Sequence, residues 1–490
     1  MKHYNYEIRI CDEINYIIKG EDSMATEKKS PNQELQEKLS VKKESAWLLL
    51  KDKVNDIYDF AEEYKQFIGK NKTERLCVRS MVEMLKQKNY KDIQTVSKLL
   101  KGDAVYKNIK GKSLIACKIG SDPTKIRIIG AHIDSPRLDL KPYPLYEDAE
   151  VALLKSHYYG GIKKYQWVNI PLAIHGVAFA KDGHCVEIHI GENHDEPRFI
   201  IPDLLPHLAK DQMKKTGENI IEGEELNILF AHIPIDDKEI KEKIKLNVLQ
   251  YLYNTYGLVE EDFIAADIEL VPAMQPVDIG IDRGLIAAYG QDDKACAYTA
   301  WKAIVDADNC KDTVIMYLAD REEIGSMGDT GAESFVFIHF MREYIRKTGI
   351  TATWDELLEG ALSISADVTG ALDPTFKNVN DPNNVSYLGH GVSIEKYGGR
   401  GGKYSTSEAH AEYMQFLRSL ADKHKIPWQT GEQGKIDMGG GGTIAMFMSR
   451  YGMDCVDVGP CMLGMHSPYE VTSKVDIYCT YLIYKAFFED

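Results

Sequence analysis

The sequence predicts an α/β protein with two domains: an α/β/α domain with a mostly parallel central sheet, and a smaller β-rich domain inserted into it. Three observations lead to this prediction. The 490 residues exceed one ordinary hydrophobic core, so two domains are expected. Short apolar, β-branched runs alternate with helical patterns over most of the chain, as in parallel sheets covered by helices. Between about Leu138 and Pro276 this alternation gives way to successive short strands.

The N-terminal part of the chain changes character at about residue 46. Residues 1–45 are polar and rich in Lys and Glu, and we expect a flexible arm. Met24 within this arm is a second possible start of translation. Beyond it, apolar residues recur at steps of three and four from Val54 to Ile68 and predict a helix. Thr73 is the expected N-cap of the next helix.

The α/β domain is expected to comprise residues 46–137 and 277–490. Its first part ends in KIRIIGAHIDS, a β-branched run typical of a buried parallel strand. Its second part resumes the alternation, with predicted strands at 285–290, 313–319, 361–366, 392–395 and 455–459 and predicted helices at 294–307, 407–424 and after 443. The inserted domain, residues 138–276, contains strand-like segments at 151–159, 168–180, 184–191 and 198–205 and a charged helix within 236–257. We expect this domain to serve in oligomerisation or as a lid.

Composition excludes several classes of partner. The formal net charge is -16, from 59 basic and 75 acidic residues, and such a surface repels nucleic acid. Nine cysteines without a CxxC pair indicate reduced thiols. No run approaches the roughly 18 apolar residues of a membrane span, and Arg9, Asp12 and Glu13 interrupt the region where a signal peptide needs an apolar core. We therefore expect a soluble, cytoplasmic protein without a membrane partner.

Histidine and acidic residues follow the predicted strands at their carboxyl ends. They are His132, Asp134, Asp292, Glu322, Glu323, Asp367 and His466. In open α/β sheets this edge is where ligands bind. Charged residues mostly just face water, but these follow several separate strands, so we expect them to meet in one site.

Local spacing agrees with a shared site. Neighbours in a strand point to opposite faces, so Glu322 and Glu323 can share a site only if the strand has ended. Gly325 supplies the turn that this requires. His132 and Asp134, two residues apart, keep the same face, which suits a carboxylate that orients a liganding imidazole.

These side chains fit a pair of cations. Two His, two Asp and one Glu as ligands, with one Glu left over, suit two ions that share a bridging carboxylate. Imidazole together with carboxylate favours Zn, or Co or Mn, over Ca and Mg. In two-metal hydrolases, with ions about 3.5–4 Å apart, both cations acidify one water and a free carboxylate takes its proton.

Six motifs stand in order along the chain: AHIDSPRLDLKP, GQDDKACAYTA, ADREEIGSMGDTGAESF, SADVTGALDP, KYGGRGGKYST and MGGGGTIA with MLGMHSPYE. Together they resemble the aspartyl aminopeptidase (aminopeptidase I) family of co-catalytic zinc metallopeptidases. The resemblance spans roughly residues 46–490. It implies a catalytic α/β domain with an inserted β-rich domain, assembled as a dodecamer.

The resemblance also implies a role for each site residue. His132 and Asp367 would hold one metal, Glu323 and His466 the other, and Asp292 would bridge them. Glu322 would be the general base and Asp134 the carboxylate that orients the liganding imidazole. In GQDD, relatives more often have Asn after the bridging Asp, so Asp293 adds a charge, and an exchange of roles between Asp292 and Asp293 stays open.

Three residues are candidates for substrate binding. IPDLLPHLA resembles the family segment in which a His of a neighbouring subunit reaches the substrate, which implies this role for His207. Lys396 aligns with the family lysine expected to meet an acidic side chain, and Lys403 replaces a family arginine. Residues 439–443, GGGGT, lack the Lys-Ser/Thr ending of a phosphate loop and predict close backbone approach to a peptide.

The sequence thus predicts a metal-dependent aminopeptidase that removes single N-terminal residues, Asp or Glu in preference, from peptides. An aminopeptidase for neutral residues, or another exopeptidase or deacylase on the same scaffold, is the nearest alternative. A catalytically dead assembly protein is an alternative of another class. The complete ligand set and the additional carboxylate of Glu322 argue against it.

Overall fold

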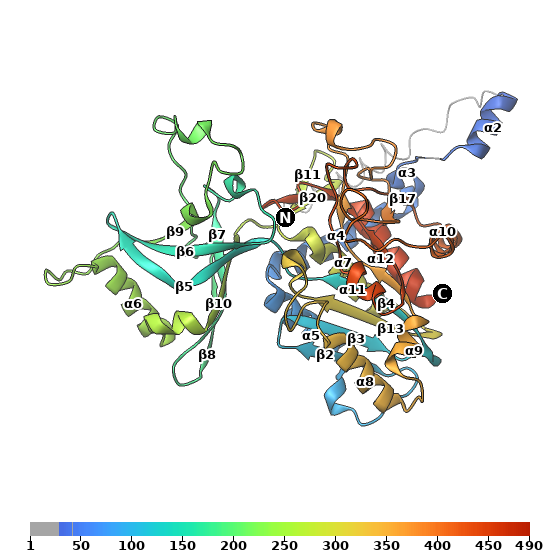
Figure 1. Ribbon diagram of the computed structural model, residues 1–490, viewed down its shortest axis with the longest axis horizontal. Helices are drawn as coiled ribbons and strands as arrows, with labels where there is room; N and C mark the ends of the chain where they lie inside the picture. The colour runs from blue at the N-terminus through green and yellow to red at the C-terminus, as the bar shows by residue number, and fades with distance from the viewer. Residues whose placement is uncertain (1–28, 42) are drawn as a thin grey trace, which may run out of the picture.

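The computed structural model describes residues 29–41 and 43–490 (Figure 1). The possible start at Met24 and most of the expected arm, residues 1–45, therefore lie outside the described residues. The described part of the arm contains helix α2 (Pro31–Leu39), which buries none of its residues. This helix has no apolar stripe for hydrophobic periodicity to detect, and Ser30 begins it through a capping box with Gln33.

The larger body of the protein contains a nine-stranded sheet. Its order is β1 (Lys91–Asp92), β2 (Ala104–Ile109), β3 (Ser113–Lys118), β13 (Asp312–Ala319), β4 (Asp122–His132), β14 (Leu362–Ser365), β18 (Asp454–Gly459), β16 (Val392–Glu395) and β17 (Trp428–Thr430). The four central strands, β13, β4, β14 and β18, run parallel. On either side of them, β3 pairs antiparallel with β13, and β16 with β18. The centre of the sheet is therefore parallel, as predicted, and its flanks are mixed.

The register of the central strands brings their carboxyl ends to one level. His132, the last residue of β4, pairs with Ala319, the last residue of β13. Gly130 of β4 pairs with Ser365, the last residue of β14. Residues that follow these strands therefore meet at one edge of the sheet, where ligands bind in such folds.

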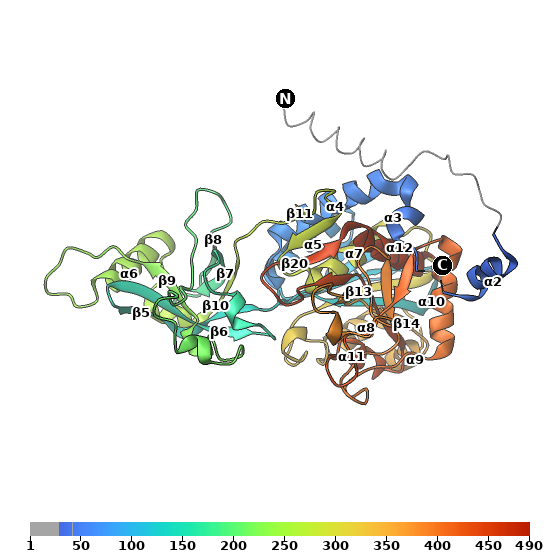
Figure 2. The ribbon, with the colours of Figure 1, turned by 90° about the horizontal axis from the view of Figure 1, so that it is seen from above.

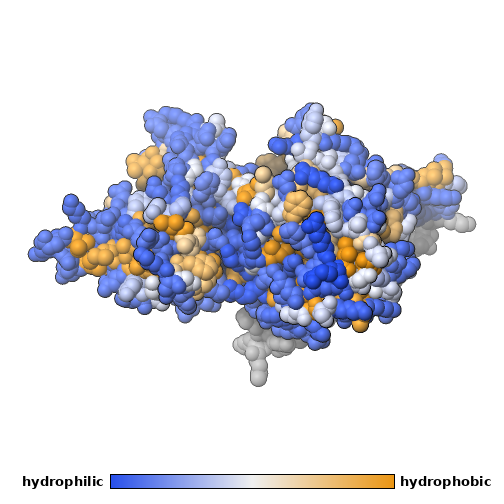
Figure 3. Space-filling view, turned by 60° about the horizontal axis from the view of Figure 1, so that its bottom comes forward, coloured by the Kyte–Doolittle hydropathy of each residue, from blue (hydrophilic) through white to orange (hydrophobic). Residues whose placement is uncertain are grey.

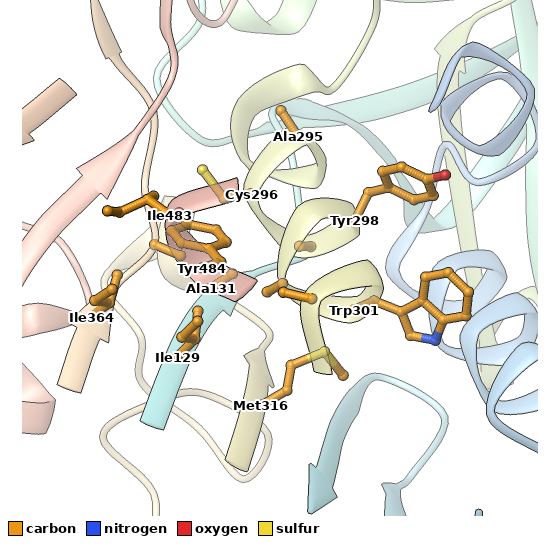
Figure 4. Close-up of a cluster of buried hydrophobic side chains, with 14 of the residues drawn as sticks. Ile129, Ala131, Ala295, Cys296, Tyr298, Trp301, Met316, Ile364, Ile483 and Tyr484 are labelled. Carbon is orange, nitrogen blue, oxygen red and sulfur yellow. The ribbon is translucent and has the colours of Figure 1, made fainter. Parts of the chain in front are cut away.

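Helices cover both faces of this sheet. One face carries α3 (Ala46–Leu49), α4 (Val54–Lys70), α5 (Glu74–Gln87), α7 (Gln291–Asp306), α10 (Ala411–His424) and α12 (Lys474–Glu489), and the other carries α8 (Val336–Thr348), α9 (Trp354–Glu359) and α11 (Ala445–Ser449). Ile128 and Ile129 of β4 belong to different apolar clusters, because neighbouring strand residues face opposite sides. Figure 4 shows Ile129 and Ala131 with Tyr484 of α12 beside α7. No helix among the described residues combines the length and apolar character needed to cross a bilayer.

A second, six-stranded sheet lies beside the larger body (Figures 1 and 2). Its order is β8 (Cys185–Ile190), β7 (Leu172–Phe179), β10 (Ala266–Pro272), β5 (Arg137–Asp148), β6 (Val151–Tyr159) and β9 (Asn227–Ala231). All of its neighbouring strands are antiparallel. With helix α6 (Lys243–Tyr256) it encloses a hydrophobic core of its own. We call this unit, from β5 to β10 with helix α6, the second domain.

A small third sheet supports the edge of the nine-stranded sheet. It contains β11 (Val277–Ile279), β12 (Leu285–Ala288), β20 (Glu470–Ser473), β19 (Cys461–Leu463) and β15 (Thr369–Gly370). The segment 285–290 was expected in the main alternation of strands and helices, but its strand, β12, belongs to this separate sheet. The reason is that β12 pairs antiparallel with β20 along its whole length.

Candidate metal centre

Four of the predicted site residues project from the edge of the nine-stranded sheet. His132 ends β4, and Asp367 follows β14 by two residues. Glu322 and Glu323 begin a single 3-10 turn directly after β13. This turn lies between two left-handed residues, at its N-cap and at Gly325 with φ 97°, so the strand has ended and both glutamates can reach the same cavity.

Segments that follow strands of the small third sheet position two further predicted residues. Asp292 lies in the first turn of α7, which begins shortly after β12. His466 follows β19 and has a φ of 63°. The third sheet thus brings Asp292 and His466 to the edge of the nine-stranded sheet.

The distances between these side chains are those of ligands around cations. The Nε2 atom of His132 lies 3.1 Å from Oδ1 of Asp292. The Nε2 atom of His466 lies 3.2 Å from Oδ2 of Asp292 and 3.4 Å from Oε2 of Glu323. Ligands bound tetrahedrally at 2.0–2.1 Å lie about 3.3 Å from one another. Asp292 Oδ1 and Glu323 Oε1 are buried without a hydrogen-bond partner among the described residues, so the donor set fits zinc.

Burial of so many carboxyl groups shifts their pKa values. Burial raises the pKa of Glu322 to about 7, and raises the pKa values of Glu323 and Asp367 well above the usual range. Burial alone would lower the pKa of His466, but the carboxylates of Asp292 and Glu323 raise it to about 10. The side chains therefore form a buried group with excess negative charge, which divalent cations would neutralise.

Two further carboxylates fix the backbone of the site. Asp134 is fully buried and accepts hydrogen bonds from the N–H groups of Glu322 at 3.1 Å and Glu323 at 3.2 Å. Glu470 of β20 accepts from the N–H groups of Asp292 at 3.1 Å and His466 at 2.8 Å. Sequence reasoning did not single out Glu470. Its place at the end of the MLGMHSPYE motif is the signal that could have revealed it.

Both imidazoles also have a defined orientation. The Nδ1 atom of His132 lies 3.1 Å from the carbonyl oxygen of Asp134, and Nδ1 of His466 lies 2.8 Å from the carbonyl oxygen of Gly161. A carbonyl only accepts, so each Nδ1 carries a proton and each Nε2 is the nitrogen that faces the cavity. Burial alone would lower the pKa of both imidazoles, but the neighbouring carboxylates raise it, so a cation would bind Nε2 by displacing its proton.

The two neighbouring aspartates occupy different positions. Asp292 places one oxygen beside each imidazole. Asp293 instead accepts the backbone N–H of His132 at 3.3 Å and forms a candidate ligand cluster with His132 and Asp367. A second candidate cluster contains His132, Asp292 and Glu323. The carboxylate of Asp292 therefore lies between the two imidazoles. The carboxylate of Asp293 lies on the His132 side only.

These residues open into a cavity of about 1190 Å³. Two glycine-rich segments, residues 398–402 and 439–442, line it, as expected for close backbone approach to a peptide. Its charged lining includes Lys163, Arg400, Lys403, Lys435, Glu395, Glu432 and Asp457 in addition to the site residues. Of the basic residues, Lys163 and Lys435 were not among the sequence candidates. Lys163 lies in the inserted segment and Lys435 just before the MGGGGTIA motif, and neither belongs to a motif.

The predicted substrate-binding residues lie at different distances from this cavity. Lys403 lines it, with Nζ 2.8 Å from Oε1 of Glu408 and 4.0 Å from the centre of the Tyr397 ring. Lys396 is exposed on the same loop and is not among the described residues that line the cavity. His207 is exposed on the second domain and is not among the described residues that line the cavity of its own chain.

A set of imidazoles and carboxylates at the carboxyl edge of an α/β sheet, opening into a cavity that can hold a peptide, is the arrangement of a metal-dependent hydrolase. Comparison with known proteins identifies the family. The family described as aminopeptidase I zinc metalloprotease (M18) matches residues 67–488, and the chain belongs to it. It is a metal-dependent aminopeptidase.

Relatives match nearly the whole chain. A probable M18 family aminopeptidase 1 of Clostridium acetobutylicum is 44% identical over 455 residues, which cover 90% of this chain and 97% of the relative. The crystal structure of an M18 aminopeptidase from Thermotoga maritima matches with a TM-score of 0.89 and 42% identity, covering 92% of this chain and 100% of that one. The mApe1 dodecamer of S. cerevisiae has a TM-score of 0.70 at 22% identity, covers 88% of this chain and 96% of that one, and so shares the fold.

Proposed function

We propose that the protein uses two divalent cations to remove single N-terminal residues, acidic ones in preference, from peptides. The position of Asp292 supports this most directly. Its two oxygens lie 3.1 and 3.2 Å from the Nε2 atoms of His132 and His466. One carboxylate between two imidazoles is what two ions with a shared ligand require.

The donor set favours zinc, with cobalt or manganese as alternatives. His132 and Asp367 would hold one cation, Glu323 and His466 the other, and Asp292 both. When bound, the cations would polarise the peptide carbonyl and acidify a water molecule. The protein contributes ligands whose backbone and ring orientation are already fixed, so little rearrangement is needed on binding.

Glu322 is the proposed general base. It lies beside the ligands without belonging to either candidate cluster. Its Oε2 is 4.0 Å from Nε2 of His132, and its side chain lines the cavity. From this position Glu322 can take the proton of the attacking water and deliver it to the leaving amine.

The charges of the cavity suit a free amine and an acidic first side chain. Glu395 and Glu432 line it and can receive the amine, while Arg400 and Lys403, with Lys396 on the same loop, supply positive charge. The ion pair between Lys403 and Glu408 is 43% and 45% exposed, so it is weak enough to be exchanged for a substrate carboxylate. If the ion pair between Lys403 and Glu408 stays formed when substrate binds, Lys403 cannot meet an acidic side chain, and the alternative of neutral substrates is favoured.

We further propose that the protein works as a homo-oligomer, a dodecamer, in the cytoplasm. Leu204, Leu205 and Leu208 are exposed around His207. Figure 3 shows hydrophobic residues gathered on the surface of the second domain, at the left of the view. Such surfaces mark contacts between proteins. An exposed loop of one subunit would then bring His207 to the cavity of its neighbour.

Metal removal and a substrate panel test the proposal. Enzyme dialysed against a chelator should lose activity on aminoacyl reporter peptides and regain it with Zn, Co or Mn. The same peptides with an acetylated N-terminus should resist cleavage, because the site requires a free amine. Cleavage of acetylated peptides would favour another exopeptidase or a deacylase. No cleavage with any metal or substrate would favour an assembly protein.

A further inference from the structure

The end of strand β6 reaches from the second domain into the metal centre. Tyr159, its last residue, is 9% exposed and donates its hydroxyl hydrogen bond to Oδ2 of Asp134 at 2.8 Å. Asp134 itself lies between β4 and β5, next to His132. A side chain of the six-stranded sheet thus completes the hydrogen bonding of a carboxylate in the catalytic domain.

The next two residues contact the other half of the centre. The carbonyl oxygen of Gly161 accepts the Nδ1 proton of His466 at 2.8 Å. Gly160 has a φ of +76°, and a Cβ atom added there would lie 3.4 Å from Cβ of Glu323. Residues 159–161 therefore touch both sides of the ligand set, and a glycine at 160 permits the close approach.

Tyr159 is itself firmly held. It pairs in register with Arg137 of β5, whose guanidinium lies 4.0 Å from the centre of the tyrosine ring. Arg137 is buried and forms ion pairs with Glu74 at 3.3 Å and Glu269 at 3.4 Å. The ring therefore has a fixed place at the junction of the two domains, and its hydroxyl has a fixed direction.

We propose that Tyr159 is a positioning residue of the peptidase, which acts through Asp134. Its hydroxyl hydrogen bond holds the carboxylate that fixes the backbone of Glu322 and Glu323 and faces the Nδ1 atom of His132 at 3.4 Å. Without that hydroxyl, Oδ2 of Asp134 retains the N–H of Glu323 at 3.2 Å. The carboxylate then keeps its two backbone hydrogen bonds but loses the one that fixes Oδ2 from the second domain, so the ligand and the base are held less firmly. This role rests on the proposed function of these residues.

The variant Tyr159→Phe removes one oxygen atom and keeps the ring over Arg137. Groups that orient metal ligands typically contribute 10–100-fold to metal affinity or activity. We expect kcat to fall about 10-fold with KM within about twofold of wild type. The cobalt-loaded variant should also release its metal to a chelator about 10-fold faster, followed by the visible absorption of cobalt. Tyr158→Phe, on the exposed neighbour in the same strand, is the matched control and should change neither value.

A double-mutant cycle with Asp134→Asn distinguishes positioning from a general structural role. If Tyr159 acts through Asp134, the double variant should be no slower than Asp134→Asn alone, because coupled residues are not additive. Additive losses, or a Tyr159→Phe enzyme with wild-type kcat and cobalt release, would overturn the inference. A wild-type enzyme that binds no metal or cleaves no peptide would instead refute the proposed function, so the two failures are separable.

Discussion

Asp134 and Glu470 hold opposite halves of the metal centre by the same means. Each is buried, and each accepts backbone hydrogen bonds from two residues whose side chains enter the site. Asp134 holds Glu322 and Glu323, which follow β13. Glu470 holds Asp292 and His466, which follow β12 and β19 of the third sheet. The ligands are therefore fixed at their backbones as well as at their imidazole rings, which favours a site formed before any cation binds.

Glu470→Gln should weaken metal binding. A glutamine offers one acceptor oxygen, so its NH₂ group would face one of the two N–H donors, of Asp292 or His466. We expect metal affinity to fall about 10–100-fold, measured by chelator competition. Glu83→Gln, on an exposed glutamate of α5, is the control and should bind metal normally. Unchanged affinity in Glu470→Gln would show that the backbone hydrogen bonds do not position the ligands.

Glu322→Gln should separate chemistry from metal binding. Its side chain lies outside both candidate clusters, so the metal content should stay at the wild-type value. Loss of the base should lower kcat by about 10²–10⁴-fold. Glu323→Gln is the matched comparison, because its carboxylate faces His466 at 3.4 Å and its loss should reduce metal content. Near-wild-type turnover of Glu322→Gln would exclude it as the base.

Asn substitutions at residues 292 and 293 should decide which aspartate is the bridge. Asparagine offers one oxygen ligand instead of two, so Asp292→Asn should weaken binding of both ions. Asp293→Asn should affect only the ion beside His132, because the Asp293 carboxylate lies on that side. Elemental analysis of metal per chain measures the difference. If Asp293→Asn emptied both positions while Asp292→Asn kept both, the roles would be exchanged.

Lysine variants test the preference for acidic substrates. Lys403 lines the cavity but is 43% exposed, so Lys403→Ala should lower kcat/KM for Asp and Glu substrates by up to about fivefold, as expected for an exposed charge partner worth about 0.2–1 kcal/mol. Leu substrates should change little. The same assay on Lys396→Ala shows whether the exposed lysine of this loop also meets the substrate. A wild-type enzyme that prefers Leu to Asp and Glu tenfold would rule out acidic specificity.

His207→Ala tests completion of the site by a neighbouring subunit. His207 is exposed and is not among the described residues that line the cavity of its own chain, so its loss should lower activity without changing metal content. Activity of the wild type should also fall on dilution to monomers. Light scattering combined with an activity assay measures both. A fully active monomer would contradict the role of His207 between subunits.

The sequence allowed prediction of residues whose position follows from strand order. His132, Asp367 and the Glu322–Glu323 pair come directly after apolar strands, and the parallel centre of the sheet places them together. Glu470 and Tyr159 could not be found in this way. Their contribution is a hydrogen bond to a partner far away in sequence, and neither periodicity nor spacing encodes such a pairing. The third sheet escaped prediction for the same reason, because β12 and its partner β20 are far apart in the sequence.

The spread of the proposed ligands along the chain affects the biosynthesis of the enzyme. His132 emerges from the ribosome long before His466, and β20, whose Glu470 holds the backbone of His466, emerges later still. Closing a loop of this length costs entropy that the partial chain cannot recover, since the third sheet is still missing one of its central strands. The proposed metal centre therefore cannot assemble until the segment from His466 to β20 has been synthesised.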